Sequence, residues 1–179
     1  MSEKVALVTG AATGIGAAVC RELAIQGVRV AVCDINKVDG EALAKKIGGE
    51  FIDCNVTNLV SVQSAVNICT QRMGIPDYVH LNAGIMTVPT GEPFLAIEDV
   101  TEAQYQKIVG VNLNGVYHGM KTVLPLMRDK GGAVTITAST AGLSVVPVDP
   151  MYTATKYALI GFGRAVAAAN EGTNIRVNV

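Results

Sequence analysis

The sequence predicts an α/β fold built on a doubly wound, open parallel β-sheet. Strand-like and helix-like segments alternate six times along the 179 residues, and a glycine-rich turn separates the first strand from the first helix. Right-handed crossovers then give the strand order 3-2-1-4-5-6, with helices covering both faces of the sheet. Because no linker or repeat divides the chain, we expect one domain spanning residues 1–179.

The expected strands are short runs rich in β-branched or other apolar residues. They cover residues 5–9, 28–33, 51–52, 78–81, 133–137 and 175–179. The segments between them place apolar residues at helical spacing, and most of them end at a glycine. We expect helices at residues 14–26, 37–47, 58–73, about 102–128 and 151–170, with loops at 86–94 and 143–150.

Composition excludes several classes of protein. Half of the residues are hydrophobic, 16% are charged and the net charge is -1, which favours a large core and argues against nucleic acid or an anionic membrane as the main partner. No apolar run approaches the roughly 20 residues of a membrane-spanning helix, and the first residues do not resemble a signal peptide. Cysteine and histidine spacing predicts no metal site. We therefore expect buried thiols in a reducing cytoplasm, at Cys20, Cys33, Cys54 and Cys69.

The last predicted strand, residues 175–179, would be an apolar edge strand with nothing after it. Natural proteins rarely leave such an edge bare. We therefore expect the protein to continue past Val179.

The turn after the first strand has the pattern of a phosphate site in a Rossmann-type fold. Its sequence is TGAATGIG, and its glycines allow positive φ angles and the close approach of a pyrophosphate. The following helix would direct its free N–H groups and positive dipole end at that phosphate. A plain glycine turn is the alternative, but the strand–turn–helix context favours nucleotide binding. The predicted contacts are Gly10, Thr13, Gly14, Ile15 and Gly16.

Asp34 stands 18 residues after Gly16, at the end of the second predicted strand. A carboxylate there can accept hydrogen bonds from both adenosine ribose hydroxyls and would repel a 2′-phosphate. The turn carries no Arg or Lys. The nearest cation, Lys37, lies one residue too far along the chain to meet a 2′-phosphate. The sequence therefore favours NAD over NADP. Capping of the next helix by Asp34 is compatible with the same position.

Ser139, Tyr152 and Lys156 form the most informative pattern. Tyr152 and Lys156 lie four residues apart on one predicted helix face, where an ammonium beside a phenol favours the phenolate. Such a phenol can act as general acid and base between an alcohol and a carbonyl. Ser139 ends the fifth strand, at the sheet edge where ligands bind. A solvated Tyr–Lys pair is the alternative, which the nucleotide turn and Ser139 disfavour.

These motifs resemble the short-chain dehydrogenase/reductase (SDR) family, and the resemblance runs over all 179 residues. The turn matches the family's TGxxxGxG, and Asn82, Ala83 and Gly84 match the end of its NNAG motif. The family's catalytic tetrad is matched by Asn112, Ser139, Tyr152 and Lys156.

The resemblance implies a role for each tetrad residue. Tyr152 would transfer the proton and Ser139 would position the substrate oxygen. Lys156 would bind the nicotinamide ribose and support the phenolate, and Asn112 would anchor a water in a proton relay. Hydride would pass between the substrate carbon and nicotinamide C4. The resemblance also implies a homodimer or homotetramer through helices 102–128 and 151–170.

The chain departs from the family pattern in three places. Leu81 stands where the family usually has Asn, just before Asn82. Asn55, followed by Val56, replaces the usual adenine-binding Asp, and we expect its amide oxygen to accept from the adenine amino group. The family's C-terminal lid and seventh strand are absent from this chain.

The segment between Ser139 and Tyr152 is apolar and holds no Arg or Lys. Met86 and Val88 could add apolar walls, so we expect a small neutral, hydrophobic ketone or secondary alcohol as substrate. The alternative is that these residues only pack the core.

For the whole chain, the rival interpretations are a catalytically silent NAD-binding or scaffold protein and a sugar-nucleotide epimerase, whose turn usually reads TGxxGxxG. His118 is expected to be an ordinary helix residue.

Overall fold

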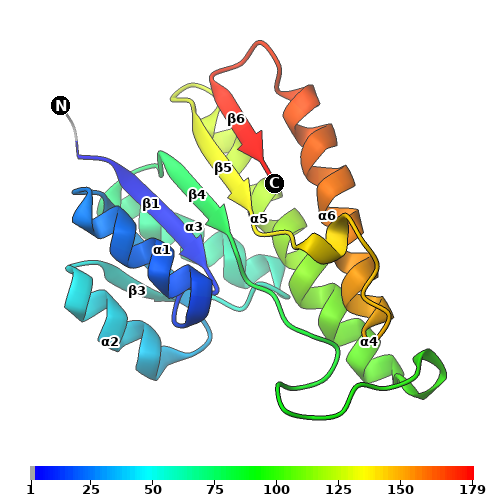
Figure 1. Cartoon of the computed structure of the whole chain (residues 1–179). Coiled ribbons are helices and arrows are strands. Elements are labelled where there is room, and N and C mark those ends of the chain that lie inside the picture. Colours follow the sequence, from blue (N-terminus) through cyan, green and yellow to red (C-terminus); the bar gives the residue numbers. More distant parts are fainter. Residues whose placement is uncertain (1–2) are drawn as a thin grey trace.

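Six parallel strands form one sheet in the order β3-β2-β1-β4-β5-β6 (Figure 1). This computed structural model describes residues 3–179. The registers are regular, and in the centre Leu7 lies opposite Ala31 on one side and Val79 on the other. The predicted fold class and strand order are confirmed. The strands are β1 (Val5–Thr9), β2 (Arg29–Asp34), β3 (Glu50–Asp53), β4 (Tyr78–Leu81), β5 (Gly132–Ile136) and β6 (Ile175–Asn178).

The helices begin and end close to the predicted residues because local capping signals mark their ends. Asn36 and Asn58 cap α2 and α3 by accepting backbone N–H bonds, and Gly48 ends α2 with φ +66°. The helices are α1 (Gly14–Ile25), α2 (Lys37–Ile47), α3 (Leu59–Met73), α4 (Glu102–Val109), α5 (Gly115–Met127) and α6 (Pro150–Ala169), with short 3-10 turns η1 (Ile97–Asp99) and η3 (Thr140–Gly142).

The predicted long helix 102–128 differs in one respect. Its α4 and α5 halves are joined by a five-residue π-helical segment, η2 (Gly110–Asn114), in which the Gly115 N–H donates to the Gly110 carbonyl. The apolar pattern did not reveal this because one wider turn hardly disturbs helical spacing. π-Helical turns inside α-helices occur frequently at functional sites, and Asn112 lies within this one.

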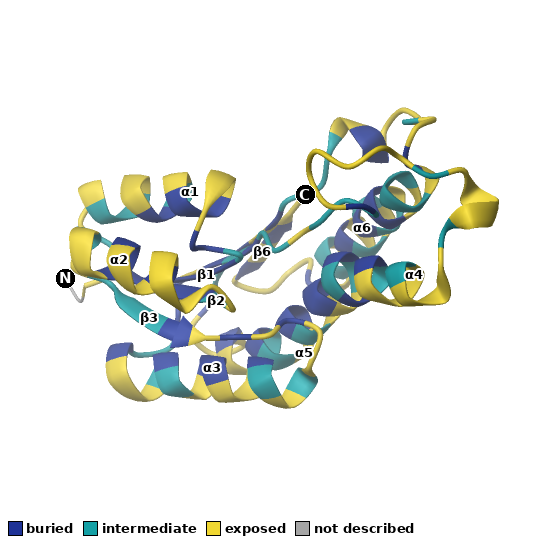
Figure 2. Ribbon diagram, turned by 90° about the horizontal axis from the view of Figure 1, so that it is seen from below, coloured by how far each residue is buried: buried dark blue, intermediate teal, exposed yellow. Residues whose placement is uncertain are grey.

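The helices are divided unequally between the two faces of the sheet (Figures 1 and 2). α1 and α2 follow the strands that run from β1 outward to β3, and right-handed crossovers place both on one face. The later crossovers run the other way, so α3, α5 and α6 cover the opposite face. Among the described residues, no helix covers β5 and β6 on the α1 side, where Thr135, Arg176 and Asn178 are exposed. The prediction of helices on both faces therefore holds for only part of the sheet.

Two hydrophobic clusters make the core, one on each face of the sheet. The four cysteines are unpaired and buried in these clusters, as predicted. Burial raises the pKa of the Cys20 thiol to about 12 and that of Cys69 to about 11, so these thiols are held in the unreactive protonated form. Within residues 3–179, no helix has the length and apolar content needed to cross a membrane.

All six strands point their carboxyl ends toward one edge of the sheet, as the parallel arrowheads in Figure 1 show. The glycine turn, Asp34, the segment after β4 and the η3 turn leave the sheet at this edge. α6 begins beside the same edge. The fold therefore gathers the predicted functional residues in one place.

Candidate active site

The turn after β1 leaves no room for side chains at two of its glycines. A Cβ at Gly10, where φ is +61°, would lie 2.7 Å from the Ala83 Cα. A Cβ at Gly16 would lie 2.2 Å from the Gly10 carbonyl oxygen. Both distances are far below any normal contact, so the turn can form only with glycine at these positions.

The amino end of α1 is open to a ligand. Thr13 occupies the N-cap position, but its side chain accepts no hydrogen bond from the helix. Gly14 and Ile15 are exposed there. The turn contains no Asp or Glu whose negative charge would repel a phosphate. The first N–H groups of α1 and the positive end of its dipole are therefore available to a phosphate.

The segment after β4 holds this turn in place. The Thr9 hydroxyl accepts hydrogen bonds from the Asn82 N–H (3.1 Å) and the Ala83 N–H (3.4 Å). The Asn82 side chain donates back to the Gly10 carbonyl at 3.0 Å. Asn82 and Ala83 therefore shape the phosphate turn directly, which the sequence motif alone did not specify.

Asp34 braces the same turn from the other side. One carboxylate oxygen accepts from the Ala12 N–H and the other from the Asn36 N–H, both at 2.9 Å. Asn36, not Asp34, caps α2 by accepting from the Asp39 N–H, so the alternative of Asp34 as the helix cap is wrong. Each carboxylate oxygen keeps lone-pair capacity for a ribose hydroxyl.

Asn55 and Val56 lie on the loop after β3. The Asn55 side-chain oxygen accepts from both the N–H (3.0 Å) and the hydroxyl (2.8 Å) of Thr57, and its NH₂ group has no partner among residues 3–179 and can meet a base. This differs from our expectation that the oxygen would receive the adenine amino group. Val56 is buried against Gly115, and its carbonyl accepts from the His118 ring at 2.9 Å. His118 thus has a structural role that joins α5 to this loop.

Asn112 is fully buried, and its amide joins three segments of the site. Its oxygen accepts from the Ile85 N–H at 2.8 Å, and its NH₂ donates to the Ile85 carbonyl (2.9 Å) and the Thr155 hydroxyl (3.1 Å). Both amide hydrogens are therefore used within the protein. The anchoring of a water by Asn112 stays a prediction, and such a water could not take a hydrogen from this amide.

Tyr152 and Lys156 face each other near the start of α6. The Lys156 Nζ lies 5.4 Å from the centre of the Tyr152 ring and donates to the Thr137 carbonyl at 2.8 Å. Lys156 is only 3% exposed, and burial lowers its pKa to about 8. The Tyr152 hydroxyl has no hydrogen-bond partner within residues 3–179, so it is free to meet a substrate.

Ser139 follows β5 and caps the η3 turn, where its Oγ accepts from the Ala141 N–H at 3.1 Å. The hydroxyl hydrogen of Ser139 is thus still available to a substrate oxygen. A Cβ at Gly142 would lie 2.7 Å from the Lys156 carbonyl oxygen, which shows how closely η3 packs on α6. This packing brings the Ser139 segment beside the Tyr–Lys pair. Gly84 also lies at this place, because a Cβ there would be 3.4 Å from the Lys156 Nζ.

Thr137 connects the nucleotide turn with the lysine, and sequence reasoning missed it. Its hydroxyl donates to the Asn82 side-chain oxygen at 3.0 Å and lies 3.3 Å from His80 Nε2. Its carbonyl accepts from Lys156. Burial lowers the pKa of His80, which favours the neutral ring. The available signal was the pair of threonines, Thr135 and Thr137, alternating on an otherwise apolar strand.

Asp149 is the second residue that was missed. It is 2% exposed and caps α6 by accepting from the Tyr152 N–H at 2.9 Å. It also accepts from the N–H (3.0 Å) and the hydroxyl of Thr87, which lies 62 residues away in the loop after β4. The signal for the cap was present, since Asp followed by Pro is typical of the first positions of a helix.

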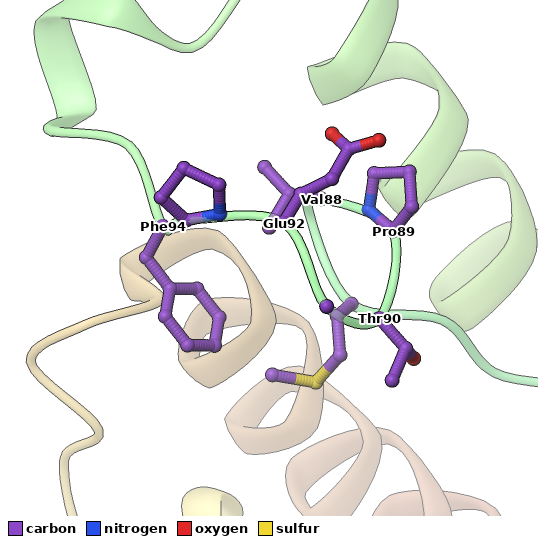
Figure 3. Close-up of a pocket in the computed structure, with 8 residues that line it drawn as sticks. Val88, Pro89, Thr90, Glu92 and Phe94 are labelled. Carbon is purple, nitrogen blue, oxygen red and sulfur yellow. The ribbon is translucent and has the colours of Figure 1, made fainter.

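An open hollow of about 660 Å³ lies within the loop after β4 (Figure 3). All of its lining side chains come from this loop, and Glu92 is the only charged one. The others are apolar or small: Met86, Val88, Pro89, Thr90, Gly91, Pro93 and Phe94.

Comparison with known proteins gives a consistent result. The family model described as short chain dehydrogenase matches residues 4–179. The short-chain dehydrogenase reductase ATA1 of Arabidopsis thaliana is 36% identical over 178 residues, which are 98% of this chain and 64% of that protein. The chain thus spans less than two thirds of this relative's length.

Two solved structures have the same fold. A 3-ketoacyl-(acyl-carrier-protein) reductase from Brucella melitensis, complexed with NADH, is 29% identical with a TM-score of 0.91, and the match covers 97% of this chain and 73% of that one. An alcohol dehydrogenase from the archaeon Thermococcus sibiricus, complexed with 5-hydroxy-NADP, is 28% identical with a TM-score of 0.89. That match covers 98% of this chain and 74% of the other.

Proposed function

Because the chain belongs to the short-chain dehydrogenase family, we propose that it uses NAD to interconvert a secondary alcohol and a ketone. The observation that carries the proposal is the buried Lys156 ammonium, 5.4 Å from the ring of a Tyr152 whose hydroxyl is free. A phenol beside such a cation can exchange a proton with a substrate oxygen.

The cofactor would lie along the carboxyl edge of the sheet. The glycine turn and the open end of α1 suit its pyrophosphate, Asp34 suits the adenosine ribose, and Lys156 suits the nicotinamide ribose. The bound nicotinamide supplies or accepts the hydride at its C4. The observation that supports the fit of these residues to the cofactor is the shape of the turn after β1, in which a side chain at Gly10 or Gly16 would collide with the backbone.

The protein's own residues would handle the proton and the geometry. In the oxidation direction, the Tyr152 phenolate accepts the proton of the alcohol hydroxyl while the alcohol carbon loses a hydride. The substrate then leaves as a ketone, with two hydrogens and two electrons removed. Ser139 donates its hydroxyl hydrogen to the same substrate oxygen, and Lys156 holds its ammonium beside the Tyr152 ring. In the reduction direction each transfer runs backward.

The choice of NAD over NADP rests on Asp34. Its carboxylate lies at the end of β2, where it would repel a 2′-phosphate. Its two oxygens are already oriented by the Ala12 and Asn36 N–H groups, which fixes the negative charge in place.

The two loops that flank the tetrad favour a small neutral, hydrophobic substrate, while the hollow that Ser139 itself lines holds one cation, Arg164. The hollow after β4 is apolar except for Glu92, which would repel a carboxylate or phosphate. The loop after η3 exposes Leu143, Val145 and Val148 to solvent. Large apolar side chains exposed on two loops beside one site are typical of a surface that binds an apolar molecule.

We also propose a homodimer or homotetramer assembled through α4, α5 and α6. These helices expose Tyr105, Tyr117 and Tyr157, and exposed tyrosines are enriched at protein interfaces. Light scattering on the purified protein would test the assembly.

The four unpaired, buried thiols support a cytoplasmic location, which cell fractionation would test.

The activity is tested by incubating the purified protein with NAD and a panel of secondary alcohols, and by following the absorbance of the reduced cofactor. We expect turnover with apolar secondary alcohols and little with carboxylated ones. A protein that binds NAD but reduces none of it across the panel would contradict the proposal.

A further inference from the structure

We propose that Asp149 is a positioning residue that fixes Tyr152 and the loop lining the hollow after β4 relative to each other. The inference rests on the proposed function, because it assigns a task to a residue beside the proton-transferring phenol. Asp149 is nearly fully buried, and its carboxylate accepts hydrogen bonds from both sides of the site.

The donors to Asp149 belong to two segments that the rest of the fold brings together. On one side, the Tyr152 N–H donates to Oδ1 at 2.9 Å at the start of α6. On the other side, the Thr87 N–H donates to Oδ2 at 3.0 Å, and the Thr87 hydroxyl donates to Oδ1. One carboxylate therefore joins the backbone of the catalytic tyrosine to the loop.

A helix cap alone does not explain this arrangement. The caps of α2, α3 and α4 are Asn36, Asn58 and Thr101, all exposed, and each accepts from the N–H groups of its own helix. Burial of a carboxylate is costly unless hydrogen bonds compensate it. Asp149 is the buried exception among these caps, and the bonds that compensate it include two from outside α6.

Asp149 and Asn112 hold the same loop at neighbouring points. Asn112 binds the backbone of Ile85, and Asp149 binds Thr87 two residues later. Val88 is buried next to this second point, and the chain then becomes exposed and lines the hollow. The Asp149–Thr87 contact therefore holds the loop between Met86 and Val88, two residues that line the hollow.

The test compares four variants of the purified protein. Asp149→Ala removes both connections. Asp149→Asn keeps an oxygen at Oδ1 for the Tyr152 N–H and the Thr87 hydroxyl but presents NH₂ to the Thr87 N–H. Thr87→Val removes the hydroxyl bond alone. Thr101→Ala, which removes the α4 cap, is the matched control, because the side chain of Thr101 bonds only to Gln104 within residues 3–179.

We expect Asp149→Ala to lower kcat by about 10- to 100-fold with NAD affinity unchanged, because small misplacements of reacting groups cost this much. Asp149→Asn should fold like the wild type and mainly raise KM for the alcohol. The Thr87 amide should exchange its hydrogen at least about tenfold faster in both Asp149 variants. Thr101→Ala should leave kcat within about twofold of the wild type.

Two outcomes would overturn the inference: unchanged Thr87 exchange in Asp149→Ala, or an equal loss of kcat in Thr101→Ala. Hydrogen exchange at Thr87 needs no activity. A wild-type protein without turnover would therefore contradict the proposed function, while the exchange data would still decide whether Asp149 fixes the loop.

Discussion

The ammonium of Lys156 lies 5.4 Å from the centre of the Tyr152 ring and is anchored 2.8 Å from the carbonyl oxygen of Thr137. Tyr152 and Lys156 lie four residues apart on α6, and Thr137, which holds the ammonium, follows directly after β5. Thr137 also binds Asn82, which in turn holds the Gly10 carbonyl of the phosphate turn. The tyrosine–lysine pair is therefore connected through hydrogen bonds to the place where a nucleotide would sit.

Burial of Lys156 predicts a specific dependence of stability on pH in the absence of cofactor. The folded chain releases this proton near pH 8, whereas the unfolded lysine keeps it to about 10.5. Between these values the unfolded chain binds more protons, so stability rises with pH relative to a variant without the group. In urea unfolding, we expect the free energy of unfolding of the wild type to rise with pH relative to that of Lys156→Met. The rise should be up to about 1.4 kcal/mol per pH unit.

The matched control for that experiment is Lys107→Met, which removes an exposed lysine on α4. The difference in free energy of unfolding between Lys107→Met and the wild type should not change with pH over the same range. If the difference for Lys156→Met did not change with pH either, the lowered pKa of Lys156 would be contradicted.

Asp34→Ala should change which cofactor the protein prefers. The variant loses acceptors for the ribose hydroxyls and the charge that repels a 2′-phosphate. Hydrogen bonds to a charged group contribute about 1.5–3 kcal/mol, so NAD affinity should fall by about 10- to 100-fold and NADP affinity much less. Titration with both cofactors measures the ratio, and an unchanged ratio would remove Asp34 from its assigned role. Because Asp34 also binds the Ala12 N–H, a lower thermal midpoint is expected as well.

Gly16→Ala should abolish measurable NAD binding. Its Cβ would lie 2.2 Å from the Gly10 carbonyl oxygen and 2.7 Å from the Asn82 side-chain nitrogen, so the turn would have to open. Gly161→Ala is the control, since a Cβ there meets nothing within 4 Å inside α6. That variant should bind NAD normally and gain up to about 1 kcal/mol in stability. Calorimetric titration of both variants checks the prediction, which normal binding by Gly16→Ala would refute.

Asp77 should matter for stability and not for activity, since it lies at the amino edge of the sheet. Burial alone would raise its pKa, but hydrogen bonds from Lys4, the Val5 N–H and Lys130 outweigh burial and hold the pKa below its ordinary value. The carboxylate therefore stabilises the fold above the unfolded pKa, about 3.9, and this contribution is lost as the pH falls through the folded value.

Asp77→Asn should accordingly lower the free energy of unfolding by about 2 kcal/mol at neutral pH, and the deficit should shrink below about pH 4. Asp129→Asn, at an exposed turn, should have no such effect. Denaturant unfolding across this range measures both. A deficit for Asp77→Asn that grows as the pH falls would have the wrong sign for this account.

Much of the fold could be predicted because its signals are local. Glycine turns, asparagine caps and apolar periodicity mark each segment, and the handedness of crossovers then fixes the strand order. The π-helical segment around Asn112 could not be predicted, since one wider turn hardly alters the apolar pattern. The bare area over β5 and β6 follows from the unequal number of crossovers on each side of β1.

The site divides in the same way. Tyr152 and Lys156 were predicted because their spacing on one helix determines their relation. Thr137 and Asp149 were missed because their partners lie far away in sequence, 55 residues for Thr137–Asn82 and 62 for Asp149–Thr87. Such contacts depend on which strand ends meet at the sheet edge, and periodicity along the chain does not reveal them.

The most direct measurement of the central claim is the turnover of Tyr152→Phe beside that of Tyr157→Phe. The second variant removes a hydroxyl from the same helix that lies on the proposed subunit interface and not in the catalytic site, and it should keep wild-type turnover as long as light scattering shows an unchanged assembly. Tyr152→Phe should lose about 10²- to 10⁴-fold in kcat, the usual contribution of general acid–base catalysis, while NAD affinity stays within about twofold. If Tyr152→Phe kept more than about a tenth of the wild-type kcat, Tyr152 would not be the group that transfers the proton.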